Sequence, residues 1–155
     1  AIQKYIDSKI AAIPPVVTAT AVPAKATSTP QARTKIVSYF PILGNGYATT
    51  STSWVDVPGS ISQFNISEFG SGSYATWDAN IWVIGGSGEA HVRLFDVTNG
   101  VVVQGSEISG SSSSSTVVTS GRLSFFSGNN TYKVQLQSKS SSTVQFDGGR
   151  IKIVF

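Results

Sequence analysis

The fold is set by residues 74–107, which have the sequence YATWDANIWVIGGSGEAHVRLFDVTNGVVVQGSE. Apolar and polar side chains alternate along residues 77–83, as in a β-strand with one buried face. A glycine-rich break follows at residues 85–88, and glycine readily adopts the positive φ angles that a tight turn requires. We expect the inward positions to be Trp77, Ala79, Ile81 and Val83, and the outward positions to be Asp78, Asn80 and Trp82.

A second and a third strand follow the glycine-rich break. Residues 90–97 alternate again, with Val92 and Leu94 inward and His91 on the other face. Asn99-Gly100 comes next, and Asn-Gly between two apolar runs is the strongest short-range signal of a β-hairpin. Residues 101–103 are three valines, which would form the returning strand. The whole stretch therefore predicts an antiparallel meander.

Further strand-like segments surround this meander and are separated by polar turns. They are residues 35–40, 53–57, 61–67, 106–108, 116–126, 131–138, 143–146 and 150–155. Turns are expected at Gly44-Asn45-Gly46 and at Asp147-Gly148-Gly149, the second of which would join the last two strands into a hairpin. About eight short strands with polar turns between them predict an all-β fold. We expect an antiparallel β-sandwich of jelly-roll type over residues 34–155.

The composition indicates a hydroxyl-rich protein of low charge. Charged residues make up 12% of the chain, about half the usual share of about 25%, and the net charge is +3. The basic residues are scattered rather than interleaved with aromatics, so we expect no nucleic acid partner. Cysteine is absent, which excludes disulfides and thiolate metal sites. No apolar run approaches the roughly 20 residues of a spanning helix, so no membrane span is expected.

The first 33 residues predict a helix followed by an extended arm. An apolar stripe at helical spacing consists of Ile2, Ile6, Ile10 and Ile13. The stripe fits either a short helix that packs on its own domain or a coil that gathers several chains, because so short a helix needs a partner. Pro14-Pro15 would end the helix, and the Pro- and Thr-rich residues 16–33 predict an extended linker. Within it, residues 16–22 alternate like a strand that could pair outside its own domain.

No residue pattern indicates catalysis or a cofactor. His91 is the single histidine of the chain, and we expect it to be an ordinary residue on a sheet face. Asp147-Gly148-Gly149 and residues 78–80 carry oxygen atoms of the kind that calcium prefers, but turn and strand roles explain both segments without a metal. Residues 85–88 lead into a strand instead of a helix, which excludes a phosphate-binding loop. We therefore expect no catalytic residue, no metal and no cofactor.

Outward aromatic residues are the main candidates for a binding surface. Trp77 and Trp82 are five residues apart in one strand, so they face opposite sides of the sheet. Trp82 would lie beside Asp78 and Asn80, an arrangement that fits a sugar stacked on the ring and hydrogen-bonded to the polar side chains. Burial of the same face between subunits is the alternative that we favour. Further candidates for either role are Trp54 and Tyr74.

Five strand-and-turn motifs occur in a pattern that resembles a known family. They are SWVDV (53–57), HVRLFDVTNGVVVQGSE (91–107), SGRLSF (120–125), TYKVQLQS (131–138) and GGRIKIVF (148–155). The pattern is similar to that of jelly-roll head domains of virion and phage fibre or decoration proteins. The resemblance implies a trimeric β head, carried by an N-terminal coil or shaft, that decorates a capsid or binds a receptor. It implies no catalytic residue.

The sequence therefore predicts a non-enzymatic structural protein at a virion surface or in the extracellular space. The isoleucine stripe would assemble a homotrimer, the arm would attach to a capsid or surface scaffold, and a host glycan is an additional candidate partner. One alternative is an extracellular filament in which residues 16–22 of each chain complete the sheet of a neighbour. A second alternative is a carbohydrate-binding module whose Pro- and Thr-rich segment is an interdomain linker.

Overall fold

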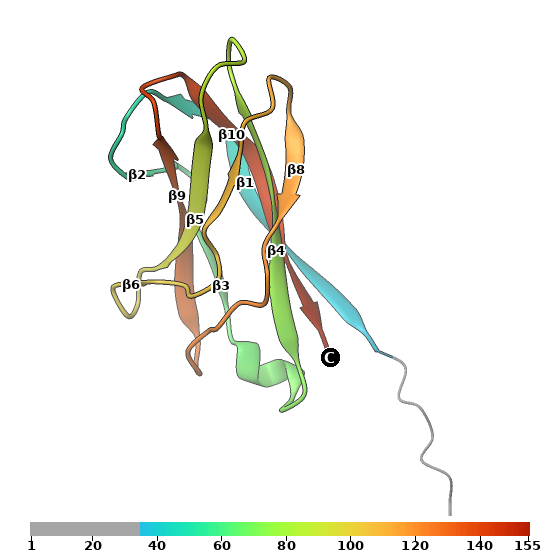
Figure 1. Cartoon of the computed structure of the whole chain (residues 1–155). Coiled ribbons are helices and arrows are strands. Elements are labelled where there is room, and N and C mark those ends of the chain that lie inside the picture. The colour runs from blue at the N-terminus through green and yellow to red at the C-terminus, as the bar shows by residue number, and fades with distance from the viewer. Residues whose placement is uncertain (1–34) are drawn as a thin grey trace, which may run out of the picture. The chain divides into compact units, whose positions relative to one another are not determined.

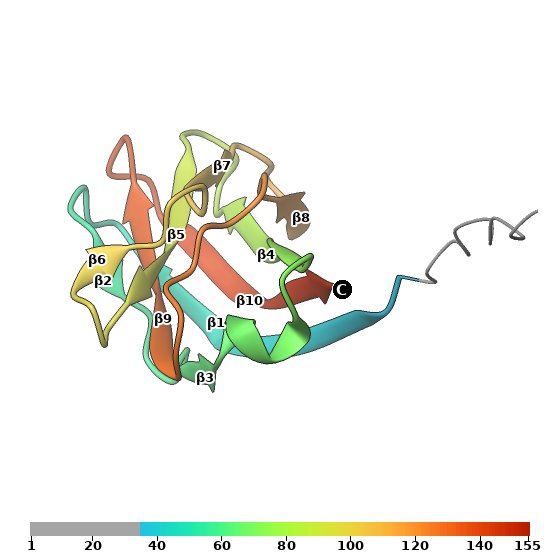
Figure 2. The ribbon, with the colours of Figure 1, turned by 90° about the horizontal axis from the view of Figure 1, so that it is seen from below.

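Two antiparallel sheets face each other in the computed structural model, which describes residues 35–155 (Figure 1, Figure 2). Sheet A has the order β1 (Val37–Thr49), β10 (Val144–Val154), β4 (Tyr74–Val83) and β8 (Thr116–Thr119). Sheet B has the order β2 (Val55–Asp56), β9 (Asn130–Ser138), β5 (Ala90–Asp96) and β6 (Val101–Val102). In the same sheet, β3 (Ser62–Phe64) pairs with β9, and β7 (Ile108–Gly110) pairs with β5. The predicted all-β sandwich is confirmed, with ten strands in residues 35–155 instead of about eight.

Helix is limited to one short turn within residues 35–155. Strand is predicted for residues 61–67, but β3 ends at Phe64 and a 3-10 turn, η1, spans Ile66–Phe69. Asn65 caps this turn, because its side-chain Oδ1 accepts a hydrogen bond of 3.0 Å from the backbone N–H of Ser67. Among these residues no helix is long and apolar enough to cross a membrane. The helix and arm predicted for residues 1–33, with the stripe Ile2, Ile6, Ile10 and Ile13, lie outside the described residues and stay predictions.

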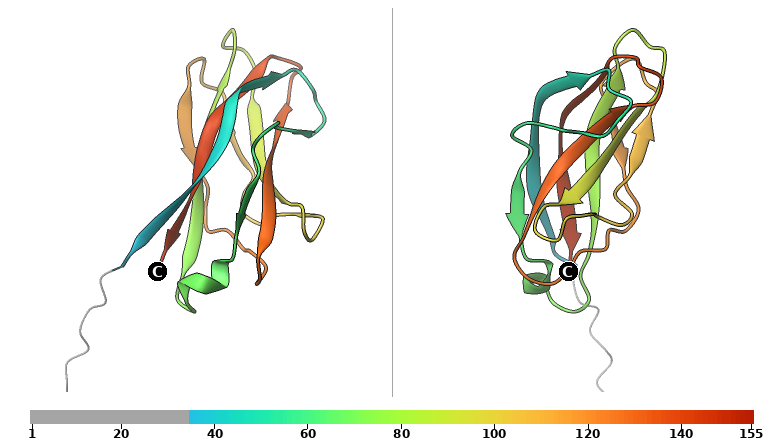
Figure 3. Two further views of the ribbon diagram at one scale, coloured as in Figure 1. Left: turned by 180° about the vertical axis from the view of Figure 1, so that it is seen from behind. Right: turned by 90° about the vertical axis from the view of Figure 1, so that its left-hand side faces the viewer.

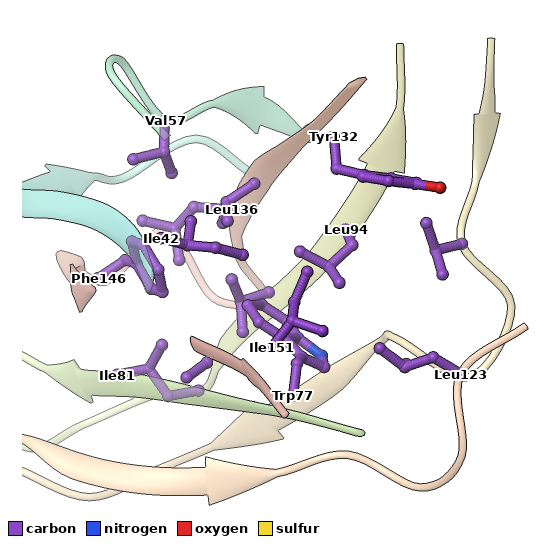
Figure 4. Packing of buried hydrophobic residues seen from close by; sticks show 14 of the residues in the cluster. Ile42, Val57, Trp77, Ile81, Leu94, Leu123, Tyr132, Leu136, Phe146 and Ile151 are labelled. Carbon is purple, nitrogen blue, oxygen red and sulfur yellow. The ribbon is translucent and has the colours of Figure 1, made fainter. Parts of the chain in front are cut away.

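Strict alternation of buried and half-buried side chains along β4 and β5 builds the core between the sheets. The predicted inward positions of β4 are all buried, and Trp77 is completely enclosed. Its indole Nε1 donates a hydrogen bond of 2.8 Å to the backbone oxygen of Ser106, so the one polar atom of this side chain is satisfied. Figure 4 shows side chains of both sheets, among them Ile151 and Leu94, meeting around Trp77.

Two of the predicted turns are wrong. Gly44-Asn45-Gly46 and Asp147-Gly148-Gly149 do not reverse the chain, because β1 and β10 each run through them as continuous strands. The two predicted C-terminal strands, 143–146 and 150–155, are thus one strand, and it pairs with β1 and β4 instead of forming a hairpin. Figure 3 shows β1 and β10 side by side as the two longest strands of sheet A.

Bulges replace these turns. Between the pairs Leu43↔Gly148 and Tyr47↔Phe146, β1 carries two residues more than β10. Asn45 has φ of 47° and Gly148 has φ of 134°, so positive φ angles bend the strands locally without reversing them. Against β4, the extra residue of β10 is Asp147. The two bulges lie next to each other in sheet A, and this placement creates the candidate site.

Candidate binding site

A shallow hollow of about 410 Å³ lies on sheet A, over the two bulges. We call it the sheet A hollow. Its polar side chains are Asn45, Asp78, Asn80, Asp147 and Arg150. Apolar groups of Pro41, Leu43 and Val117 line it as well, together with Gly148 and Gly149. The volume lies within the range of about 300–1,000 Å³ that is usual for small-molecule sites.

The strand register explains why the surface is hollow at this point. Leu43, Gly148, Asn80 and Val117 are direct neighbours across β1, β10, β4 and β8. They occupy outward positions, because both chain neighbours of Asn80 in β4 are buried in the core. Gly148 has no side chain, so the row is open between Leu43 and Asn80. Leu43 and Val117, at the two ends of the row, are 62% and 60% exposed.

The neighbouring row of the sheet carries an ion pair. Arg150 Nε donates a hydrogen bond of 2.9 Å to Asp78 Oδ2, and Thr119 Oγ1 donates one of 2.8 Å to Asp78 Oδ1. Burial raises the pKa of Asp78, but these two hydrogen bonds and the nearby positive charges outweigh burial and hold the pKa below its ordinary value. The hydrogen bond to Asp78 raises the pKa of Arg150. Both groups are therefore charged and fixed in position near neutral pH.

Asp147 provides the second carboxylate of the hollow. It accepts hydrogen bonds from Gln145 Nε2 and from Ser115 Oγ. The two segments considered for calcium, residues 78–80 and 147–149, do meet here, and each carboxylate accepts two hydrogen bonds from the protein. Among residues 35–155 no three His, Cys, Asp or Glu side chains gather as metal ligands would.

Two polar atoms on the outward face of β4 have no partner. Asn80 Oδ1 and Trp82 Nε1 are buried and make no hydrogen bond within the described part of the chain. A buried polar atom without a partner costs about 1–3 kcal/mol. Asn80 lines the hollow, and the torsion of a terminal amide is soft, so a small rotation would present its polar atoms to a ligand.

The structure separates the five predicted site residues. Asp78 and Asn80 line the hollow, and Trp82 follows on the same face of β4, half-buried and outside the lining. Tyr74 lies at the other end of β4. Trp54 directly precedes β2 and lies against Arg93 of β5, a strand of sheet B. Trp54 and Tyr74 are therefore not part of one site with Asp78 and Asn80.

Cations cover the rings of these two separate aromatic residues. The Arg93 Cζ lies 4.1 Å from the ring centroid of Trp54. The Arg122 Cζ lies 4.3 Å from the centroid of Tyr74, and Lys35 Nζ lies 5.9 Å from it. These are cation–π contacts, and a sugar cannot stack on a ring face that a cation already covers. These ring faces of Trp54 and Tyr74 are therefore not available for the predicted stacking of a sugar.

Sheet B carries a further polar cluster around His91. His91 Nε2 lies 3.2 Å from Glu89 Oε2, and Nδ1 lies 3.5 Å from Glu107 Oε1. Ser109 Oγ donates its hydrogen bond to Glu89 instead of to the histidine. Ser109 is therefore not hydrogen-bonded to the histidine, as the serine of a Ser-His-Asp triad would be. The cluster is therefore a set of polar side-chain contacts on the surface of sheet B.

Of the polar members of the hollow, sequence reasoning missed Asn45 and Arg150, and it considered Asp147 only as a turn residue or a calcium ligand. A signal was present, because Asn45 and Asp147 each stand next to a glycine in a stretch that interrupts the strand pattern. What the sequence did not show is that the two interruptions lie side by side. That depends on the pairing of β1 with β10, two strands from opposite ends of the described chain.

Comparisons with known proteins include a distant structural likeness. No protein-family model matches this chain, and no curated protein matches it. Among solved structures, the chain is similar to one described as "EclA C-terminal domain; sugar-binding protein", with a TM-score of 0.41 and 13% sequence identity. The match covers 85% of this chain and 88% of that chain. This likeness is too distant to transfer an activity, and the resemblance to fibre head domains stays a prediction.

Proposed function

We propose that this β-sandwich is a carbohydrate-binding module that holds a glycan in the sheet A hollow. The observation that carries the proposal is the row Leu43, Gly148 and Asn80. The missing side chain at Gly148 leaves room beside an apolar group on one side and an amide on the other. A sugar needs this combination, because its ring offers C–H groups to apolar side chains and hydroxyls to polar ones.

The polar groups beside this row are already in place before a ligand arrives. Asp78 is fixed by Arg150 and Thr119, and Asp147 is fixed by Gln145 and Ser115. Carboxylate, amide and guanidinium groups together supply acceptors and donors for neighbouring hydroxyls. Groups that are ordered in the free protein lose little entropy on binding. Their positions on strands instead of loops hold the geometry more tightly.

The proposed role is binding without catalysis. A glycosidase needs a carboxylic acid that keeps its proton near neutral pH, with a second carboxylate nearby. The pKa of Asp78 is lowered by its hydrogen bonds, so this residue is a poor proton donor. A carboxylate tied to Arg150 serves better as a hydrogen-bond acceptor for a hydroxyl.

The experiment that tests this function is a glycan screen followed by calorimetric titration of the full chain. Asn80→Ala is expected to weaken binding of any glycan found by about tenfold, which corresponds to one net hydrogen bond. Asn129→Ala removes the same amide from an exposed position between β8 and β9, so it is the matched control and should bind like the parent. The proposal fails if no glycan binds, or if the two variants behave alike.

A second candidate function is self-assembly for display at a virion or cell surface, as the sequence predicts. The observation that favours it is the edge strand β1 and the residue before it. Ile36, Val37 and Tyr39 are 57%, 40% and 50% exposed, although edge strands usually avoid exposed apolar groups. We propose a homo-oligomer of sandwiches of jelly-roll type, placed outside the cell or on a virion, in which several shallow sites act together.

Light scattering on the full chain tests the second candidate. A discrete trimer, disrupted by Val37→Lys on the exposed part of β1, is the expected result. A long polymer would instead favour the alternative of a filament built by strand donation. A monomer at all concentrations would contradict assembly but would leave glycan binding by the single domain untouched.

A further inference from the structure

Arg150 presents a fixed and partly unused donor group at one end of the sheet A hollow. Its Nε donates a hydrogen bond to Asp78 Oδ2, and its Cζ lies 4.6 Å from the ring centroid of Tyr39. One edge and one face of the guanidinium are therefore held by the protein. The side chain is nevertheless 54% exposed, and its Nη atoms make no hydrogen bond within residues 35–155. The free edge carries the remaining N–H donors.

The free edge of a held guanidinium has a defined chemical preference. Two parallel N–H groups match the two oxygens of a carboxylate, and such paired, charge-assisted hydrogen bonds are shorter and stronger than those to a neutral hydroxyl. Because Asp78 and Tyr39 already restrict the side chain, little entropy remains to be lost when an anion binds. A mobile surface arginine lacks this advantage.

The charges around the hollow are unequal at its two ends. Lys152 is the next outward residue of β10 after Arg150, and it lies opposite Tyr39 in the ladder with β1. Two cations thus stand at this end against one carboxylate, Asp78, which is already hydrogen-bonded. Asp147 stands on the other side of Gly148, beside the amide-bearing end of the hollow. An anionic group is therefore favoured near Arg150, and hydroxyls are favoured near Asp147.

We propose that the sheet A hollow selects glycans that carry a carboxylate, as in uronic acid units, and that Arg150 binds this carboxylate. The inference rests on the proposed function and adds a ligand class and an orientation to it. The carboxylate lies at the Arg150 end, and the neutral part of the sugar lies over Gly148 beside Asn80. Lys152 contributes long-range attraction to the anion.

The test compares three oligosaccharides of equal length on the full chain by calorimetry: an oligouronate, its neutral methyl ester and a sulfated analogue. The oligouronate is expected to bind at least tenfold more tightly than the ester, in line with one added charge-assisted bidentate contact. Arg150→Gln should remove this difference, because it weakens binding of the oligouronate by a much larger factor than binding of the ester. Arg122→Gln is the matched control, because Arg122 also lies over a tyrosine ring but outside the hollow.

The outcomes separate this inference from the proposed function. If the oligouronate and the ester bind equally well and Asn80→Ala weakens both, the carboxylate preference is wrong while glycan binding stands. If the sulfated analogue binds as tightly as the oligouronate, Arg150 recognises charge in general, and the carboxylate assignment is wrong. If none of the three binds and the wider screen is also negative, both proposals fail. Thermal unfolding of Arg150→Gln checks that the exposed substitution leaves the fold intact.

Discussion

Gly148 in β10 lies directly opposite Asn80 in β4, immediately after the extra residue Asp147 that interrupts the pairing of these strands. Its φ of 134° is a conformation that residues with side chains rarely adopt. The same glycine thus permits the bulge and leaves the space beside Asn80. An irregularity of the backbone and the opening of the candidate site have one cause.

Gly148→Ala is expected to destabilise the protein. The added Cβ would lie 3.3 Å from the backbone oxygen of Ile42, and the residue would be held at a positive φ. Strain of this kind costs about 1–3 kcal/mol, measurable as a lower free energy of unfolding in urea. Gly121→Ala is the control, since a Cβ there meets open space, and we expect a change within about 0.5 kcal/mol. Equal stability of the two variants would contradict the bulge geometry.

The two tryptophans of β4 should respond differently to replacement by phenylalanine. Trp77→Phe removes buried volume and the hydrogen bond to Ser106, so we expect a loss of roughly 2–3 kcal/mol. Trp82→Phe removes an N–H that has no partner within residues 35–155, so its loss should stay below about 1 kcal/mol. Chemical denaturation of both variants measures the difference. A larger loss at Trp82 would mean that the two faces of β4 are assigned the wrong way round.

Acid should weaken the fold partly through Asp78. Its pKa is lower in the folded protein than the ordinary value of 3.8, so the folded state favours the ionised form. The resulting stability is present above about pH 4 and is lost as the pH falls through the folded-state pKa. Asp78→Asn should therefore be less stable than the parent at neutral pH, and the gap should close in acid. Unfolding free energies measured at several pH values test this, and a gap that stays constant with pH would contradict it.

High pH should lower the stability of the fold through ionisation of Tyr132, which is completely buried in the core. Burial raises its pKa from 10.0 to about 12, so the folded state keeps the phenol protonated where the unfolded chain ionises. Its contribution to stability is complete below pH 10 and is lost as the pH rises through about 12. Tyr132→Phe should lose less stability than the parent over this interval. Identical alkaline curves would show that Tyr132 is not buried as described.

Much of the sandwich follows from local sequence. The alternation of residues 77–83 and 90–97 predicts which side chains are buried, because a strand has only two faces. The Asn99-Gly100 hairpin is also confirmed, since β5 and β6 pair across it. These features depend on a few neighbouring residues, so a local pattern is sufficient to predict them.

The bulges could not be predicted in the same way. Gly44-Asn45-Gly46 and Asp147-Gly148-Gly149 have the composition of hairpin turns, and a positive φ angle fits a turn and a bulge equally well. The choice is made by long-range pairing, in which β1 and β10 lie together over most of their length. The same applies to the candidate site. The alternation of β4 predicts that Asp78 and Asn80 face outward together. Asp147 and Arg150 lie beside them only because of the register between β10 and β4, which the sequence does not show.

The most direct test of the central claim is amide chemical-shift mapping by NMR on the isotope-labelled full chain, titrated with a glycan from the screen. Glycan binding in the sheet A hollow predicts that the shifts of Leu43, Asn80 and Gly148 change most and saturate together. Shifts confined to sheet B, around Trp54 and Arg93, would contradict the proposed site. Unchanged spectra with every glycan tested would contradict the proposed function itself.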